Sequence, residues 1–265
     1  MKAIVPIVAL LAACDQSATL PAANEVNQAA PQSAAKPTGR ASKAFIFDEK
    51  NDLIEFHYAW SAEAAAVPQL VNRFRKEMDQ VRATSAEDAR ESKANEDELG
   101  FEFHRHMYSA DYETAGKSER LLSLKFDFSA DTGGAHGHYG TGALLWDRPA
   151  GKEIKVLDLF AEASKIDQLL TQRWCDALKK EREEKRGAPV VGDEMSDKCP
   201  SLSEIAIIPA DRDKDRRFEA LMLVASPYVA GPWVEGSYDI ELGVAPELIA
   251  ALKPDFRESF EAQAQ

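Results

Sequence analysis

The stretch TGGAHGHYGTG, residues 132–142, decides how the middle of the chain folds. It places glycines, two histidines and a tyrosine between two runs of alternating apolar residues. Glycine lacks a Cβ atom, so a dense group of glycines favours a sharp reversal of the backbone or the close approach of another group. The stretch therefore predicts either the end of a hairpin or a contact surface.

The sequence on either side predicts an α+β fold with mostly antiparallel sheets, one long N-terminal helix and two shorter helices. Apolar residues between Val67 and Val81 recur every three or four positions, which indicates an amphipathic helix with a charged second half running to Glu98. Runs of strands separated by a few helices are typical of an α+β architecture. We expect strands or strand pairs at 44–60, 101–107, 121–128, 202–208, 218–225 and 238–244, a turn around Gly116, and shorter helices at 166–178 and 247–252.

The first fourteen residues have the features of a bacterial lipoprotein signal peptide. A positive start at Lys2 and an apolar core too short to span a membrane precede Leu-Ala-Ala-Cys, residues 11–14, which matches the lipobox. Cleavage before Cys14 would leave this cysteine carrying acyl groups such as palmitate; an ordinary signal peptide with a chance cysteine is the alternative. The sequence thus predicts a protein of the bacterial cell envelope, lipid-anchored to the membrane and facing the periplasm.

Three segments follow the predicted signal peptide of residues 1–14. Residues 15–43 consist mainly of Ala, Gln, Asn, Ser, Pro and Thr without a periodic apolar pattern, which predicts a disordered tether. The globular remainder divides at the turn signal Arg-Pro-Ala-Gly-Lys, residues 148–152. We expect two α+β subdomains, 44–147 and 148–265.

The charge of the chain limits its partners. It carries 45 acidic and 32 basic residues, a net charge of −13. This charge repels polyanions, so nucleic acid is not expected as a partner, and it attracts cationic molecules. An acidic surface that serves solubility alone is the other interpretation.

Cys175 and Cys199 are the two cysteines outside the signal peptide. In an oxidising compartment an even pair predicts a disulfide. Closing a loop of about 25 residues would stabilise the fold by about 3 kcal/mol. Two buried free thiols are the alternative.

Four of the five histidines form two His-x-His pairs, His104/His106 and His136/His138. Residues two apart on a strand share a face, so the pairs could offer four ring nitrogens to zinc or copper. Ordinary surface histidines are the simpler interpretation, and no cofactor is predicted. The sequence contains no Gly-x-Ser-x-Gly, His-Glu-x-x-His or phosphate-binding Gly-x-x-x-x-Gly-Lys motif, so no catalytic residue is predicted.

A second stretch dense in Pro, Gly and aromatic residues is SPYVAGPWVEG, residues 226–236. Rigid, amphipathic aromatic side chains recur at binding hot spots. Closure of a core at hairpin ends is the alternative role. Across the two stretches the candidate partner-binding residues are Gly133, Gly134, His136, Gly137, Tyr139, Tyr228, Pro232 and Trp233.

The same residues carry a family resemblance. The segment Thr-Gly-Gly-Ala-His-Gly at 132–137, then Gly-Lys at 151–152 and Leu-Asp-Leu-Phe at 157–160, resembles the extracytoplasmic domain pair shared by the lysozyme-sensing anti-sigma factor RsiV and the non-catalytic N-terminal part of the peptidoglycan deacetylase PdaC. Tyr228, Gly-Pro-Trp at 231–233 and Gly236 resemble the later Tyr-x-x-x-Pro-Tyr-x-x-Gly segment of that family. The resemblance makes 44–147 a PdaC-like and 148–265 an RsiV-like subdomain.

The resemblance implies an α+β domain pair exposed to the cell envelope and, in its anti-sigma member, a surface that clasps lysozyme. This chain differs in its predicted lipid anchor and in lacking a deacetylase domain with its Asp and His metal ligands, so no deacetylase activity follows. The sequence therefore favours a non-catalytic, lipid-anchored module that binds a cell-wall glycan or a cationic wall-cleaving protein such as lysozyme. A metal-dependent cell-wall hydrolase or deacetylase using the His-x-His pairs, or a structural envelope lipoprotein, are the alternatives.

Overall fold

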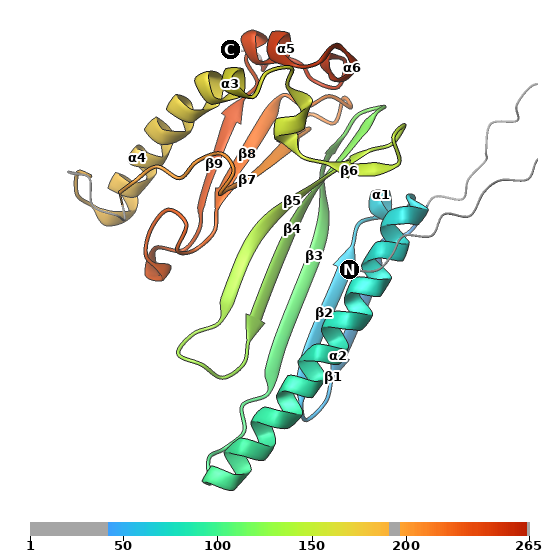
Figure 1. The fold of residues 1–265 in the computed structure, drawn as a ribbon, viewed down its shortest axis with the longest axis vertical. Helices are drawn as coiled ribbons and strands as arrows, with labels where there is room; N and C mark the ends of the chain where they lie inside the picture. Colours follow the sequence, from blue (N-terminus) through green and yellow to red (C-terminus); the bar gives the residue numbers. More distant parts are fainter. Residues whose placement is uncertain (1–41, 191–196, 264–265) are drawn as a thin grey trace, which may run out of the picture. The chain divides into compact units, whose positions relative to one another are not determined.

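The computed structural model describes residues 42–190 and 197–263, which belong to one compact unit of the chain. The predicted signal peptide, its Cys14 and nearly all of the predicted tether lie outside the described residues. A six-stranded sheet, β1-β2-β3-β4-β5-β6, and a three-stranded sheet, β7-β8-β9, confirm the predicted α+β class (Figure 1).

The strands are β1 (Phe45–Lys50), β2 (Ile54–Trp60), β3 (His106–Lys117), β4 (Leu121–Asp131), β5 (His138–Asp147), β6 (Lys152–Ile154), β7 (Ala206–Ala210), β8 (Ala220–Ala225) and β9 (Tyr238–Gly243). The helices are α1 (Ala62–Ala65), α2 (Pro68–Leu99), α3 (Ala163–Ile166), α4 (Gln172–Arg186), α5 (Pro246–Ala251) and α6 (Pro254–Arg257), with helical turns η1 (Val156–Leu159), η2 (Asp167–Thr171) and η3 (Trp233–Glu235).

The large sheet begins with the predicted hairpin. β1 and β2 pair antiparallel from Phe45 opposite Trp60 to Lys50 opposite Glu55. β2 and β3 pair in parallel, and all other neighbours in the sheet are antiparallel. A parallel pair needs a long crossover connection, and α2 supplies it (Figure 1).

Helix α2 is the long helix that the sequence predicts, and it lies between β2 and β3. It begins at Pro68, because proline has no N–H to donate and is suited to the first helical position. Its left-handed C-cap is Gly100, with φ of 74°. Its buried residues pack on the large sheet and are Leu70, Phe74, Met78 and Ala89.

The strand predicted to begin at 101 begins only at His106. α2 ends at Leu99, residues 101–105 have no regular secondary structure, and β3 begins at His106. His104 is exposed whereas His106 is 4% exposed. The prediction that these two histidines share one face of a strand is therefore wrong.

Gly116 lies within β3 and not in the predicted turn. A Cβ atom at this position would lie 2.6 Å from the backbone nitrogen of Asp211, which donates a hydrogen bond to the carbonyl oxygen of Ala115 at 3.1 Å. The missing side chain thus allows the segment after β7 to approach β3.

The predicted disulfide between Cys175 and Cys199 is confirmed, with Cα atoms 5.5 Å apart. It joins α4 to the segment before β7. Beside it, the indole of Trp174 donates a hydrogen bond to the carbonyl oxygen of Pro200 at 3.1 Å. The segment from Asp197 to Pro200 is thus tied to α4 at two points.

The buried apolar side chains form two clusters, one around β2, α2 and β3 and one around α4 and the three-stranded sheet. β6 extends the large sheet beyond the predicted subdomain boundary at 147/148, and Leu121 of β4 belongs to the second cluster. The division into two subdomains stays a prediction. Within the described residues, no helix is long and apolar enough to cross a membrane.

Candidate functional site

The two glycine- and aromatic-rich stretches meet in the structure. The imidazole of His136 stacks on the indole of Trp233 with ring centroids 4.2 Å apart and an interplanar angle of 20°. His136 Nε2 lies 3.1 Å from the hydroxyl of Tyr228. Tyr139 meets Trp233 edge-on at 6.3 Å. We call His136, His138, Tyr139, Tyr228 and Trp233 the histidine–aromatic junction.

The hairpin between β4 and β5 brings His136 into place. The ladder ends at Ala130 opposite His138, and the carboxylate of Asp131 accepts a hydrogen bond from the backbone N–H of Gly133 at 2.9 Å. Gly133 has φ of 83°, and a Cβ atom there would lie 2.8 Å from Cβ of His104. The predicted hairpin end thus depends on glycine at 133 for its conformation and for its contact with His104.

A second glycine admits the β8–β9 loop. A Cβ atom at Gly140 would lie 2.9 Å from Oγ of Ser226. That hydroxyl accepts a hydrogen bond from the backbone N–H of Thr141 at 3.0 Å. The start of the loop is therefore held directly against β5.

His136 is oriented through both ring nitrogens. Nδ1 lies 3.0 Å from the carbonyl oxygen of Gly137, which can only accept, so Nδ1 is the donor. In the neutral ring, Nε2 then accepts a hydrogen bond from the hydroxyl of Tyr228. This assignment follows from the partners.

The β8–β9 loop holds its aromatic residues on a constrained backbone. Tyr228 has φ of 70°, a conformation that side chains other than glycine seldom adopt. Its N–H donates to the carbonyl oxygen of Gly231 at 3.1 Å, and Pro232 caps η3, which carries Trp233. Strained conformations of this kind persist where the surroundings hold them and cluster at binding sites.

The junction exposes apolar surface. Tyr228 is 63% exposed, Tyr139 40% and Val234 of the same loop 84%. The indole N–H of Trp233 is buried and has no hydrogen-bond partner among the described residues. Large exposed side chains gathered at one place indicate a contact surface for another molecule.

Basic side chains of helix α4 hold the β8–β9 loop in place. Arg186 donates to both carboxylate oxygens of Glu235, at 2.8 and 3.1 Å, and to the carboxylate of Asp197 at 2.6 Å. Arg182 is 2% exposed and donates to the carbonyl oxygens of Ala230, Asp197 and Lys198. The loop and the disulfide-tied segment therefore share the same two arginines.

Glu235 links the stability of this loop to pH. Burial disfavours its charged form, but hydrogen bonds from Arg186 and Tyr238 outweigh burial and lower its pKa below the ordinary 4.5. A carboxylate with a lowered pKa stabilises the folded state above its unfolded pKa, and the contribution is lost as the pH falls through its folded pKa. We expect Glu235→Gln to lower the Tm most above about pH 5 and little below about pH 3.

Thermal unfolding across this range measures the effect. Glu258→Gln, at an exposed position, is the control and should leave the Tm nearly unchanged at every pH. A Glu235→Gln deficit that is the same at both ends of the range would contradict the role of the ionised carboxylate.

The histidines do not assemble as one metal site. The rings of His136 and His138 meet edge-on at 5.6 Å, while His106 is buried with both ring nitrogens unpartnered among the described residues. In the described part of the chain, the groups of three or more ligand atoms within 4.8 Å of one another are all acidic and contain no histidine. The four-histidine alternative thus has no common centre.

Four of the candidate residues, His136, Tyr139, Tyr228 and Trp233, meet at the junction, whereas Gly133 lies against His104. A Cβ atom at Gly134 would have no neighbour within 4 Å. The sequence did not single out Arg182, Arg186 or Glu235. Arg182 and Arg186 lie four residues apart in a run of Lys, Arg and Glu that the sequence presents as an exposed helix face. Only the structure shows that Arg182 is buried.

The fold and the junction define the class of protein, an α+β domain that presents an exposed aromatic surface. Residues 22–139 match the family model described as "Deacetylase PdaC", and this match ends within the hairpin that carries the junction. This part of the chain is therefore similar to the PdaC family, as the resemblance predicts.

The solved structures similar to this chain include two DUF3298 family proteins. One is a DUF3298 family protein from Pseudomonas aeruginosa PAO1, 14% identical over 84% of this chain and 98% of the other, with a TM-score of 0.48. The other is a DUF3298 family member from Bacteroides fragilis NCTC 9343, 14% identical over 82% of this chain and 95% of the other, with a TM-score of 0.47. No protein with a curated description matches this chain.

Proposed function

We propose that the chain is a non-catalytic, lipid-anchored module of the bacterial cell envelope that binds a cationic wall-cleaving protein of the lysozyme type through the histidine–aromatic junction. The observation that carries the proposal is the meeting of His136 with Trp233 and Tyr228 beside exposed Tyr139 and Val234. Tyrosine and tryptophan are enriched among the residues that dominate protein interfaces.

The character of the surface favours a protein over a glycan as the partner. Val234 is 84% exposed and Val229 36%, and aliphatic side chains supply no hydrogen bond to a sugar hydroxyl. Apolar side chains at a protein interface gain from burial against a second apolar surface. Glycan binding is therefore the alternative outcome of the test.

Charge supports a basic partner. The net charge of −13 would raise the rate at which a cationic protein meets this chain, and salt would screen the attraction. The lipid anchor at Cys14 and the periplasmic location belong to the proposal, because they rest on the sequence pattern alone.

Binding of the purified full chain to lysozyme tests the proposal. We expect co-elution on a sizing column at about 20 mM salt and weaker binding at about 300 mM. Ribonuclease A, a basic protein that does not cleave cell walls, is the control and should not co-elute. Sedimentation with peptidoglycan sacculi without lysozyme binding would identify a glycan-binding module instead, and binding to neither would overturn the proposal.

A further inference from the structure

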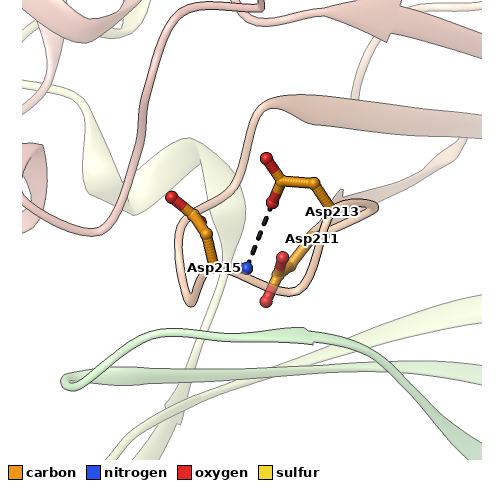
Figure 2. A group of neighbouring side chains, drawn as sticks. All are labelled: Asp211, Asp213 and Asp215. Atoms are coloured by element: carbon orange, nitrogen blue, oxygen red, sulfur yellow. Dashed lines mark hydrogen bonds between the residues drawn. The ribbon is translucent and has the colours of Figure 1, made fainter.

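The turn between β7 and β8 gathers acidic side chains. In the sequence Asp-Arg-Asp-Lys-Asp-Arg-Arg, residues 211–217, every second residue from Asp211 to Asp215 is an aspartate. Figure 2 shows the three carboxylates around one turn, with the backbone N–H of Asp215 donating to Asp213 at 3.1 Å. One carboxylate oxygen from each of the three lies within 4.8 Å of the others.

Two glutamates from other segments extend this group. Glu219, just before β8, and Glu261, near the C-terminus, each place a carboxylate oxygen within 4.8 Å of one from Asp213. Backbone hydrogen bonds fix this approach, because Phe218 donates to Ser259 at 2.9 Å and Glu261 donates to Phe218 at 3.2 Å.

The burial of Glu219 is an independent reason to expect cation binding at this group. Its side chain is 8% exposed. Oε1 accepts a hydrogen bond from the backbone N–H of Arg212 at 2.6 Å, whereas Oε2 is buried without a partner among the described residues. A buried carboxylate with an unsatisfied oxygen and no cation is costly, so such groups are usually paired or coordinate a metal.

Two basic side chains of the same turn, Arg212 and Arg217, contribute little charge to this group. The guanidinium of Arg212 donates to Glu241 on β9, at 2.9 Å from Nε. Arg217 reaches Glu261 only at 3.9 Å. Negative charge therefore remains in excess around Asp213, Glu219 and Glu261.

We propose that Asp211, Asp213, Asp215, Glu219 and Glu261 form a binding site for a divalent cation of the Ca²⁺ type. Ca²⁺ takes six to eight oxygen ligands in flexible geometry, and EF-hand loops supply them from positions 1, 3, 5, 7, 9 and 12, with glycine at position 6. With Asp211 as position 1, the other aspartates fall at positions 3 and 5 and Glu219 at position 9.

The chain departs from that loop in two ways. Arg216, at position 6, takes the left-handed conformation with φ of 79° without being glycine. Position 12 is Met222, and Glu261 from the C-terminal segment stands in for the missing acidic ligand. Cation binding would thus join the C-terminal segment to the turn between β7 and β8, independently of the junction.

Calorimetric titration of the chelator-treated full chain with CaCl₂ tests the site. We expect one saturable site with a Kd between about 10 μM and 1 mM, and weaker binding of Mg²⁺. Ca²⁺ at about ten times this Kd should raise the Tm by about 3–6 °C. The absence of saturable binding up to about 10 mM CaCl₂ would overturn the proposal.

Three variants separate a cation site from a structural acidic cluster. Asp213→Asn, at an exposed position, and Glu219→Gln should each weaken Ca²⁺ binding at least about tenfold, because ligand charge sets affinity. Asp239→Asn, on the exposed face of β9, is the control and should bind as the parent chain does. Without Ca²⁺, Glu219→Gln should melt no lower than the parent chain, since it removes a buried charge. Unchanged affinity in both cluster variants would refute the site.

Discussion

Replacing Arg182 by methionine should lower the free energy of unfolding by about 3–5 kcal/mol. The guanidinium is buried and donates to the carbonyl oxygens of Ala230, Asp197 and Lys198. Methionine fills similar space but donates no hydrogen bond, so the three carbonyl groups would lose a charged donor. Urea unfolding of the full chain measures the change.

Lys185→Met is the matched control for this prediction. Lys185 lies on the same helix and also donates to backbone carbonyl oxygens, those of Ser237 and Glu235, but it does so at the exposed surface. Its replacement should cost less than about 1 kcal/mol, as exposed charged contacts usually do. If both variants lost a similar amount of unfolding free energy, the burial of Arg182 would not determine how much it stabilises the fold.

The arginine also connects distant parts of the fold. The disulfide holds the segment at Cys199 against α4, and Arg182 joins the neighbouring Asp197 and Lys198 to Ala230 in the β8–β9 loop. We therefore expect hydrogen exchange in residues 226–236 to become faster in Arg182→Met, because the loop loses its buried donor.

Local patterns in the sequence predicted much of the fold. The apolar period of α2 and the polar turn between β1 and β2 are signals that lie within a few residues of one another, and both elements are present. The strand expected at 101–107 begins only at His106, so the alternating pattern of residues 101–105 did not by itself produce a strand. The role of Gly116 depends on the distant backbone of Asp211, which no local pattern records.

The candidate site was predictable in composition but not in geometry. Both stretches were recognisable by their glycines and aromatic residues. The contact between His136 and Tyr228 joins residues 92 positions apart, so it exists only once β5 and the β8–β9 loop have packed together. The same holds for Glu219 and Glu261, which look like ordinary surface acids until Phe218 pairs with the C-terminal segment.

Trp233→Ala should weaken binding of the lysozyme-type partner at least about thirtyfold, a loss of about 2 kcal/mol or more. This prediction rests on the proposed function. The indole stacks on His136, so the substitution would remove a rigid contact surface from the junction. Calorimetry at low salt measures the affinity.

Ile46→Ala serves as the control for an exposed apolar side chain outside the junction. Ile46 is 64% exposed on β1, at the edge of the large sheet opposite β6, and its loss should leave the affinity nearly unchanged. Equal affinity of the parent chain and Trp233→Ala would place the partner elsewhere on the molecule.

A double-mutant cycle with His136→Ala then tests whether the stacked pair acts as a unit. Stacked rings couple by about 0.5–1.5 kcal/mol beyond the apolar area they bury. If the partner binds the pair in its stacked form, either substitution alone should remove most of that coupling. The loss of binding free energy in the double variant should then be smaller than the sum of the two single losses. Additive losses would mean that His136 and Trp233 contact the partner independently, and the stack would then matter for folding the loop and not for recognition.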